Sequence, residues 1–291
     1  MSRSTVSFVL NVIAEDAAKL ADEMRALGEA SWLARGRAFD IAVTGDGAAA
    51  LTQARAIAGS RAADTNLVAA ERRRKKLLIA DMDSTIIGCE CLDELADMAG
   101  LKPRVAAITE RAMRGEIEFA PALRERVALL KGLPLSALQR VYDERVRLNP
   151  GAKALVATMH THGAKTLLVS GGFTFFTRRV AAAAGFESEQ ANVLLDDGAS
   201  LLGTVAEPIL GREAKLAALE DATRAAGLDF ADTLAVGDGA NDLGMIGRAG
   251  LGVAYHAKPV VAAAASASIA YGDLTALLYL QGYRKDEIVA A

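Results

Sequence analysis

Pairs of carboxylates stand directly after two short apolar runs of this sequence. Asp81 and Asp83 follow the run 77–80, and Asp238 and Asp242 lie in the segment GDGANDL. Carboxylates at one strand end repel each other unless a cation neutralises them, and an all-oxygen site with few protein ligands suits Mg²⁺, which also binds substrate phosphates. A carboxylate can attack phosphorus to give an aspartyl phosphate, provided that a cation offsets the charge of the phosphoryl group. The pattern therefore predicts metal-assisted phosphoryl chemistry.

A second set of residues is suited to holding a phosphate group. Ser170, Gly171 and Gly172 offer a hydroxyl group and unobstructed backbone N–H groups at an expected helix start, and Lys215 adds a point charge. Each motif alone also fits a plain turn or cap. Found together, in this order and at strand ends, they favour a functional site.

The elements that must position these groups are three short apolar runs, at 77–80, 166–169 and 233–236. Each run is continuous and ends in a small, polar or acidic loop, which is typical of strands buried on both faces of a parallel sheet. Ligands of such sheets bind at the carboxyl ends of the strands, so the three loops are expected to converge. The pattern predicts an α/β fold with a parallel sheet core.

More than eighty residues separate the first run from the second, too many for one crossover helix. Their pattern is mostly helical, which predicts a helical cap insertion over about 90–148. A β-hairpin is expected later, around Asp196-Asp197-Gly198. The expected cap helices cover 92–99, 105–114, 119–130 and 135–145, and the expected hairpin strands cover 192–195 and 201–205.

The first 70 residues predict a separate small α+β unit. Its expected strands cover 6–13 and 38–44, and its expected helices cover 15–27 and 48–58. The small and polar segment 59–66, followed by the basic run Arg72–Lys76, marks a domain boundary. We therefore expect one domain over 1–70 and a second over 71–291.

Composition narrows the function classes. With 33 basic and 36 acidic residues the net charge is −3, so nothing in the overall charge favours nucleic acid. The five basic residues Arg72–Lys76 carry no interleaved aromatics and are expected to be a solvated linker. No apolar run of about 18 residues could span a bilayer, and no secretory signal is evident, so a cytoplasmic protein without membrane association is expected.

Other reactive side chains give no site. Cys89 and Cys91 fit neither a disulfide framework nor a CxxC pair, and His160, His162 and His256 form no ligand cluster by spacing. Two further residues, Trp32 and Met82, are expected to have structural roles. Trp32 is expected in the core or at an interface of the first domain, and the Met82 side chain is expected to point into the core.

The motifs DMDST with Glu90, SGG, Lys215 and GDGANDL resemble the four signatures of the haloacid dehalogenase superfamily of phosphohydrolases. Longer segments resemble the phosphoserine phosphatases of that superfamily, over roughly 77–285: AMRGEIEF at 112–119, LRERVALLKGLP at 123–134 and VSGGF at 169–173. The resemblance implies a Rossmann-like core with a helical cap, the cofactor Mg²⁺, and hydrolysis of O-phospho-L-serine to L-serine and phosphate. That reaction is the last step of serine biosynthesis.

The resemblance also implies a role for each matching residue. Asp81 would be the nucleophile, with its second oxygen on Mg²⁺, and Asp83 would be the general acid and then the base, with its backbone carbonyl on the metal. Asp238 would complete the protein ligands. Asp242 and Asn241 would support the metal waters and the phosphate.

Ser170, the Gly171 N–H group and Lys215 would hold phosphate oxygens. A zwitterionic substrate needs one anionic and one cationic partner, and Glu90 would meet its ammonium while Arg126 meets its carboxylate through a bidentate fork.

Both residues also fit purely structural roles. Glu90 could be an acid in the first turn of a helix, stabilised by the helix dipole, and Arg126 could be a solvated charge like Arg124, two residues away. Met113 and Phe119 would close the cap over the substrate.

The N-terminal unit resembles the ACT-type regulatory fold in pattern. Amino-acid-binding members place a glycine in the first strand-to-helix loop, where this chain has Ile13–Asp16. Pairing of two such units into a homodimer is therefore expected rather than serine feedback. Three alternative functions stay open. The first is a phosphatase for phosphohomoserine or phosphothreonine, because one methylene changes the binding free energy of a substrate by only about 1 to 3 kcal/mol. The others are a non-catalytic amino-acid sensor and nucleic-acid binding through the basic run.

Overall fold

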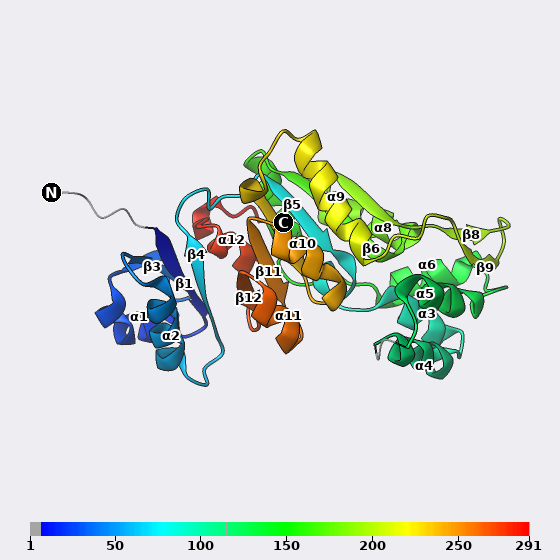
Figure 1. Ribbon diagram of the computed structural model, residues 1–291, viewed down its shortest axis with the longest axis horizontal. Coiled ribbons are helices and arrows are strands. Elements are labelled where there is room, and N and C mark those ends of the chain that lie inside the picture. The colour runs from blue at the N-terminus through cyan, green and yellow to red at the C-terminus, as the bar shows by residue number, and fades with distance from the viewer. Residues whose placement is uncertain (1–6, 114–115, 291) are drawn as a thin grey trace.

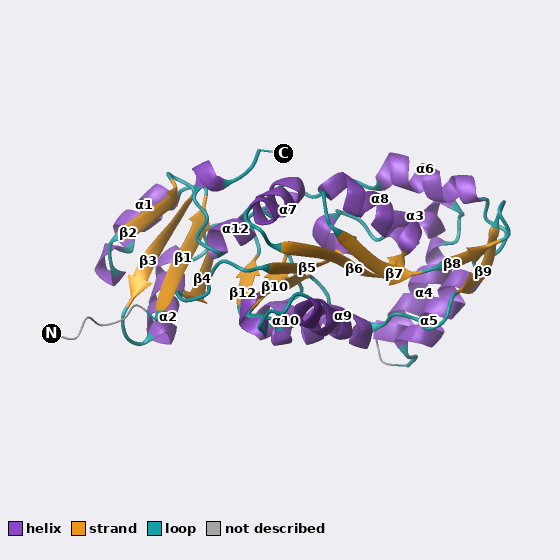
Figure 2. Ribbon diagram, turned by 90° about the horizontal axis from the view of Figure 1, so that it is seen from above, coloured by secondary structure: helices purple, strands orange, loops and turns teal. Residues whose placement is uncertain are grey.

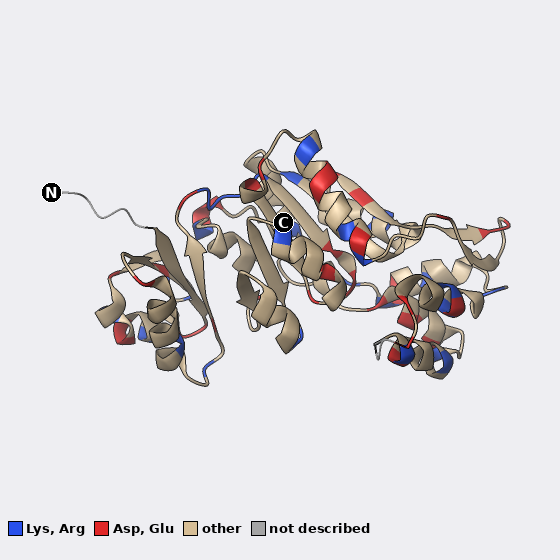
Figure 3. Cartoon of the chain, viewed as in Figure 1, with Lys and Arg blue, Asp and Glu red and all other residues tan. Residues whose placement is uncertain are grey.

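The computed structural model describes residues 7–113 and 116–290. Figure 1 shows three groups of elements along the long axis: a four-stranded sheet with two helices, a central six-stranded sheet, and helices α3 to α6 beside a small hairpin. None of the described helices has the length and apolar character needed to cross a membrane. Basic and acidic residues are interspersed over the elements (Figure 3).

The N-terminal unit is a four-stranded antiparallel sheet with the order β2-β3-β1-β4. Strand β1 lies in the centre, pairing Leu10 with Ile41 of β3 and with Leu67 of β4. Apolar residues of one sheet face pack against the two helices. The elements are β1 Phe8–Ala14, α1 Ala17–Glu23, β2 Ala30–Ala34, β3 Ala38–Val43, α2 Gly47–Ala58 and β4 Ala63–Ala69, with a 3₁₀ turn at Arg25–Leu27.

The small and polar segment 59–66 contains the start of a strand that the sequence analysis did not predict, because β4 begins at Ala63. The polar strand residues Asp64 and Asn66 are buried because both side chains bind backbone groups of residues 268–272. Asn66 donates to the Ser268 carbonyl oxygen at 3.0 Å and accepts from the Ser268 N–H at 2.8 Å. Polar side chains that bind a distant part of the backbone interrupt the apolar alternation of this strand, so the sequence pattern did not predict it.

The central sheet is parallel and has the order β12-β11-β10-β5-β6-β7. The three runs predicted to be buried strands are β5, β6 and β10, and they are neighbours, so the α/β prediction is confirmed. All five residues of β5 and of β10 are buried. The strands are β5 Leu77–Asp81, β6 Lys165–Phe173, β7 Ser188–Asn192, β10 Thr233–Gly237, β11 Leu251–Tyr255 and β12 Ala267–Ile269.

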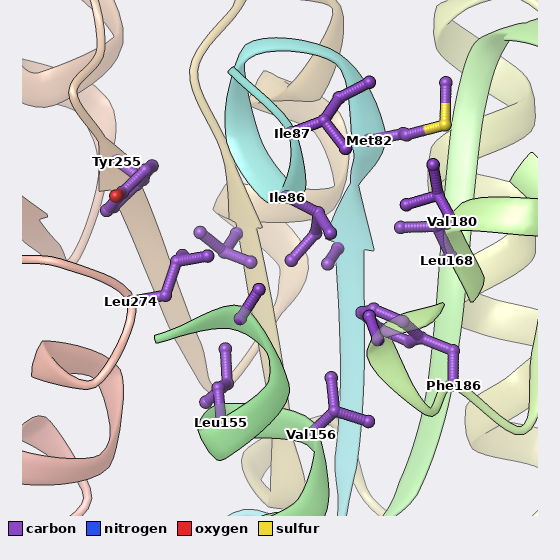
Figure 4. Packing of buried hydrophobic residues seen from close by; sticks show 14 of the residues in the cluster. Met82, Ile86, Ile87, Leu155, Val156, Leu168, Val180, Phe186, Tyr255 and Leu274 are labelled. Atoms are coloured by element: carbon purple, nitrogen blue, oxygen red, sulfur yellow. The ribbon is translucent and has the colours of Figure 1, made fainter. Parts of the chain in front are cut away.

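Helices cover both faces of this sheet, with α7 and α8 on one side and α9 and α10 on the other (Figure 2). Met82 is fully buried in the core, as expected, near Leu168 and Val180 (Figure 4). The helices are α7 Ala152–Thr161, α8 Thr174–Ala184, α9 Arg212–Ala225, α10 Leu243–Arg248, α11 Pro259–Ala264 and α12 Ala276–Leu280, with 3₁₀ turns at Phe230–Asp232, Ala240–Asp242 and Lys285–Glu287.

The insertion after β5 is helical, as its pattern predicted, and the expected hairpin is present beside it (Figure 1). Two short segments connect the helices to the core: Ile87 bridges Leu148, and the Gly88 N–H donates to the Arg147 carbonyl oxygen at 3.2 Å. The elements are α3 Cys91–Met98, α4 Lys102–Met113, α5 Phe119–Ala128, α6 Leu135–Arg145, β8 Leu194–Asp196 and β9 Leu201–Val205.

The basic run 72–76 is only partly solvated, which corrects the expectation of a solvated linker: Arg72, Arg74 and Lys76 are exposed, whereas Lys75 is buried. Its side chains also bind specific acceptors, and Arg72 pairs with Asp232. Arg74 pairs with Glu287 at 2.7 Å. Arg72 and Arg74 therefore already have carboxylate partners within the chain.

Arg73 fastens the N-terminal sheet to the core. Its guanidinium binds Asp40 of β3 in bidentate fashion, at 2.6 and 2.9 Å, and donates to the carbonyl oxygens of Tyr279 and Leu280. The side chains of Arg73 and Asp40 are only 13% and 11% exposed. Trp32 of β2 packs at the helical face of the same sheet, 5.4 Å from the Phe39 ring centroid, as expected.

Arg73→Leu is expected to lower the free energy of unfolding by about 3 to 5 kcal/mol, because it leaves the Asp40 carboxylate buried without its charged partner and with only the Asn11 amide donating to it. Urea unfolding followed through the single tryptophan, Trp32, measures this in the N-terminal sheet itself. The control is Arg25→Leu, which removes an exposed pair with Asp22 and should cost less than about 1 kcal/mol. Equal losses for both variants would contradict the fastening role.

Candidate active site

The predicted site residues of three loops meet at one edge of the central sheet. Asp81 is the last residue of β5, and its neighbours β10 and β6 lead to Asp238 and Ser170. Because these strands are parallel and adjacent, their carboxyl ends lie side by side. The convergence expected from the sequence is therefore what the fold produces.

Three carboxylates crowd together here. Asp81, Asp238 and Asp242 each offer an oxygen, and these oxygens lie within 4.8 Å of one another. The buried Lys215 ammonium lies between two of them, with Nζ at 2.6 Å from Asp81 Oδ1 and 2.7 Å from Asp242 Oδ1. The Met82 N–H also donates to Asp81 Oδ1, at 2.8 Å, so the orientation of that carboxylate is fixed.

The charges of this cluster do not cancel among the four side chains. Burial raises the pKa of Asp81 well above its usual range, although the Lys215 charge opposes the rise. Burial, followed by the charge of Asp242, also raises the pKa of Asp238. Burial alone would lower the pKa of Lys215, but the two carboxylates raise it overall and keep the ammonium charged. Three acids against one ammonium leave a net charge that a divalent cation with oxygen ligands would balance.

Asp83 is held by two donors from different parts of the chain. Ser170 Oγ donates to its Oδ2 at 2.9 Å, and the Cys91 N–H at the start of α3 donates to its Oδ1 at 2.9 Å. Burial raises the pKa of the Asp83 carboxyl. Gly172 makes this approach possible, because a Cβ there would lie 3.0 Å from Ser170 Oγ and 3.2 Å from Asp83 Oδ2.

Sequence reasoning missed two of these groups. The Cys91 backbone N–H could not be predicted from the residue type, since almost any residue at that position supplies the same donor. Thr85 is buried, and its hydroxyl donates to Asp238 Oδ1 at 3.4 Å. Its place in the DMDST segment was the signal that could have identified it.

The predicted side chains of the third loop follow β10 closely. Asp242 is fully buried in the 3₁₀ turn 240–242, and its Oδ2 accepts from the Gly239 N–H at 3.0 Å. Asn241, in the same turn, is half-buried. A Cβ at Gly237 would lie 2.4 Å from Asp242 Cγ, so the glycine allows the carboxylate to fold back over the strand end.

Phe119, at the start of α5, reaches across to the core. Its ring lies over Gly171 and Gly211, where added Cβ atoms would be 3.2 and 3.1 Å from ring carbons. The structure therefore brings Phe119 to the Ser170–Gly171 segment. The side chain of Met113, the last residue of α4, lies outside the part of the chain that is described.

Glu90 caps the start of α3 and faces the β5 loop. Ser84 Oγ donates to Glu90 Oε1 at 2.7 Å. Glu90 as a whole residue is exposed. Loss of water around its carboxylate nevertheless raises the pKa of Glu90 to about 7, and the negative charge of Asp83 adds to that rise. An added ammonium group would relieve this crowding of negative charge.

Arg124 and Arg126, two residues apart on α5, differ in surroundings. Arg124 pairs with Glu207 at 2.6 Å and is exposed. Arg126 is half-buried, donates Nε to the Ala122 carbonyl oxygen at 3.2 Å, and forms no ion pair with any described carboxylate. Burial lowers the pKa of Arg126, and the charges of Asp93 and Glu90 act in the opposite direction. Its terminal nitrogens are therefore available to an anion.

The three histidines have separate surroundings. His160 faces Glu187 at 3.3 Å, the His162 ring is tilted against that of Tyr283 with centroids 5.0 Å apart, and His256 binds the Gly272 carbonyl oxygen. Cys89 and Cys91 are both free thiols.

Comparison with proteins of known sequence gives one family. The model of the haloacid dehalogenase-like hydrolases matches residues 78–247. The phosphoserine phosphatase of Polaromonas sp. is 49% identical over 210 residues, which cover 70% of this chain and 89% of that protein.

Solved structures extend the likeness. The probable phosphoserine phosphatase of Vibrio cholerae, in unliganded form, has a TM-score of 0.81 at 30% identity and covers 99% of this chain and 90% of its own. A substrate-bound phosphoserine phosphatase complex has a TM-score of 0.66 at 35% identity, covering 71% of this chain and 98% of its own. The first of these likenesses includes the N-terminal unit, whereas the second covers a smaller share of the chain.

Proposed function

The chain belongs to the haloacid dehalogenase-like hydrolase family, and we propose that it is a Mg²⁺-dependent phosphatase that hydrolyses O-phospho-L-serine to L-serine and phosphate. The observation that carries this proposal is the pair Glu90 and Arg126. An anion and an unpaired guanidinium, both on the helical insertion, match the two charges of an amino acid, while the core offers a phosphoryl-transfer site.

In the proposed reaction the Asp81 carboxylate attacks phosphorus, the bond to the serine oxygen breaks, and an aspartyl phosphate forms. The donors on Asp81 Oδ1 support this role because they fix the carboxylate before the substrate enters. Water then attacks the aspartyl phosphate and releases inorganic phosphate, which regenerates Asp81.

Asp83 moves the protons of both steps. It donates a proton to the departing serine oxygen, and in the second step it takes a proton from the attacking water. Ser170 and the Cys91 N–H hold one Asp83 oxygen each, which supports the role because the carboxyl is aimed by both the core and the insertion.

Charge on the phosphoryl oxygens is balanced by Lys215, the Ser170 hydroxyl and the Gly171 N–H. The acidic cluster fits Mg²⁺, with Asp81, Asp238 and the Asp83 carbonyl oxygen as its proposed ligands. When bound, the ion neutralises the charge that would otherwise repel an anionic nucleophile from a phosphate ester. Asp242 and Asn241 are proposed to support the waters around this site.

The amino-acid end is proposed to lie under the helical insertion. Glu90 receives the ammonium group and Arg126 the carboxylate, while Phe119 and Met113 cover the substrate. The contact of Phe119 with Gly171 and Gly211 supports this closure, since it brings the insertion onto the phosphate-binding segment. In this arrangement the insertion over about 90–148 is the cap of a catalytic domain that spans 71–291.

Residues 1–70 are proposed to be an ACT-like unit that pairs two copies of the chain. Among the described strands none pairs with the outer edge of β2, and an open strand edge is a template for a second strand. Light scattering on the intact chain is expected to give twice the mass of the monomer. A monomeric mass at micromolar concentration would contradict the pairing.

The function is tested by phosphate release from O-phospho-L-serine, O-phospho-L-threonine and an aryl phosphate, each with Mg²⁺ and with EDTA. We expect a clear preference for phosphoserine and loss of all activity in EDTA. Asp81→Asn, prepared in parallel, should be inactive and guards against a contaminating phosphatase. Equal rates on all three esters would reject the amino-acid pocket, and no turnover by a folded chain would favour the sensor alternative.

Arg126→Ala is expected to lower kcat/KM for phosphoserine by about 10- to 150-fold, mainly through KM, because it removes a charged hydrogen bond worth about 1.5 to 3 kcal/mol. The aryl phosphate has no α-carboxylate, so its kcat/KM should stay within about two-fold. Arg124→Ala is the matched control, since that guanidinium is already paired with Glu207. Equal losses on both esters would remove Arg126 from the carboxylate role.

A further inference from the structure

Strand β6 bulges outward just before its end. Val169 is paired with Gln190 of β7, and the next pair is Phe173 with Asn192, so β6 uses more residues than β7 over the same stretch. Three residues of β6, Ser170, Gly171 and Gly172, lie opposite the single residue Ala191 of β7. Such a bulge turns side chains and N–H groups away from the ladder, and it leaves backbone groups that need partners elsewhere.

Asn192, the last residue of β7, supplies one of those partners. It is only 3% exposed, and its Nδ2 donates to the Gly171 carbonyl oxygen at 2.9 Å. The same Nδ2 donates to the Leu210 carbonyl oxygen at 3.1 Å, and Oδ1 accepts from the Leu210 N–H at 2.7 Å. One buried amide thus joins two segments that are distant in sequence.

Both segments carry groups of the phosphate site. Gly171 follows Ser170, whose hydroxyl binds Asp83. Leu210 precedes Gly211, from which α9 starts, and Lys215 lies in the first turns of that helix. A shift of either segment would change the distance between the Ser170 hydroxyl and the Lys215 ammonium.

The same pair of segments forms the surface under Phe119. Its ring lies over Gly171 and Gly211, where an added Cβ would come within 3.2 and 3.1 Å of ring carbons, closer than ordinary van der Waals contact. Asn192 binds Gly171 directly, and it binds Leu210, the residue before Gly211. Its side chain acts on the site through them, since its hydrogen bonds are with backbone groups of Gly171 and Leu210.

We propose that Asn192 is a positioning residue for phosphoryl transfer: it sets the spacing between the Ser170–Gly171 segment and the start of the helix that carries Lys215. The inference rests on the proposed phosphatase function, but it concerns the phosphate end of the site and is independent of which ester is hydrolysed. Asn192 acts through backbone groups and does not touch the substrate.

Asn192→Ala is expected to lower kcat for phosphoserine by about 10- to 100-fold, since a displacement of about 1 Å can cost that much. The Kd for inorganic phosphate, measured by titration calorimetry with Mg²⁺ present, should rise about 10-fold. Asn192→Asp is nearly isosteric and can still accept from the Leu210 N–H, but it opposes two carbonyl oxygens with a carboxylate. It should show the same losses.

Asn66 provides a matched control away from the site. It is 1% exposed, and it joins backbone groups by the same kind of two-way amide contact, through the Ser268 N–H and carbonyl oxygen. Asn66→Ala and Asn66→Asp should lower the melting temperature as the Asn192 variants do. Their kcat and phosphate Kd should remain within about two-fold of the wild-type values.

The positioning role is overturned if the Asn192 variants lose melting temperature alone, with kcat and phosphate Kd within two-fold of wild type. Failure of both variants to fold also overturns it, because the residue would then be structural. A wild-type chain that binds phosphate without hydrolysing phosphoserine would reject the proposed substrate but leave the comparison of phosphate Kd values to decide on Asn192. A wild-type chain that binds no phosphate would overturn both.

Discussion

The Lys215 ammonium, buried between the carboxylates of Asp81 and Asp242, is the interaction on which the arrangement of this molecule depends. Buried charges are tolerated only when partners and hydrogen bonds replace the lost water. Three adjacent strands must therefore bring their ends to one point, and α9 must start close enough for its Lys215 to reach β5. The excess of acids that remains, with Asp238 added, is a negative charge that a divalent cation with oxygen ligands would balance.

Such crowding needs backbone without side chains at particular positions. A Cβ at Gly237 would fall 2.4 Å from Asp242 Cγ, and one at Gly172 would press on Ser170 Oγ at 3.0 Å. These glycines serve close approach rather than an unusual backbone conformation, since neither has a positive φ. The loops are rich in glycine because carboxylates and a hydroxyl must fold back over the strand ends that carry them.

Much of this could be predicted from the sequence because the chemistry and the burial are local. Continuous apolar runs identified β5, β6 and β10, and each ran directly into its site loop. Strand β4 escaped because Asp64 and Asn66 are buried against partners more than 200 residues away, which no local pattern encodes. The choice between Arg124 and Arg126 was open for the same reason: it depends on Glu207, which a different segment supplies. The role proposed for Asn192 could not be predicted from the sequence, since its side chain binds two backbone segments that only the fold brings together.

Long-range contacts of this kind also connect the N-terminal unit with the loop that follows Asp81. Asp64 of β4 accepts from the N–H groups of residues 270–272, and two residues later the Leu274 N–H donates to the Pro150 carbonyl oxygen. The neighbouring Asn149 donates its amide to the Thr85 carbonyl oxygen at 2.8 Å, beside the two segments that lead into the helical insertion. The first sheet, the connection to the insertion and the β5 loop thus share one continuous hydrogen-bonded framework. The N-terminal unit is therefore joined to the catalytic half of the chain by a series of hydrogen bonds, whereas Asp81 and Asp83 themselves are held by donors of the β5 loop, Ser170, Lys215 and Cys91.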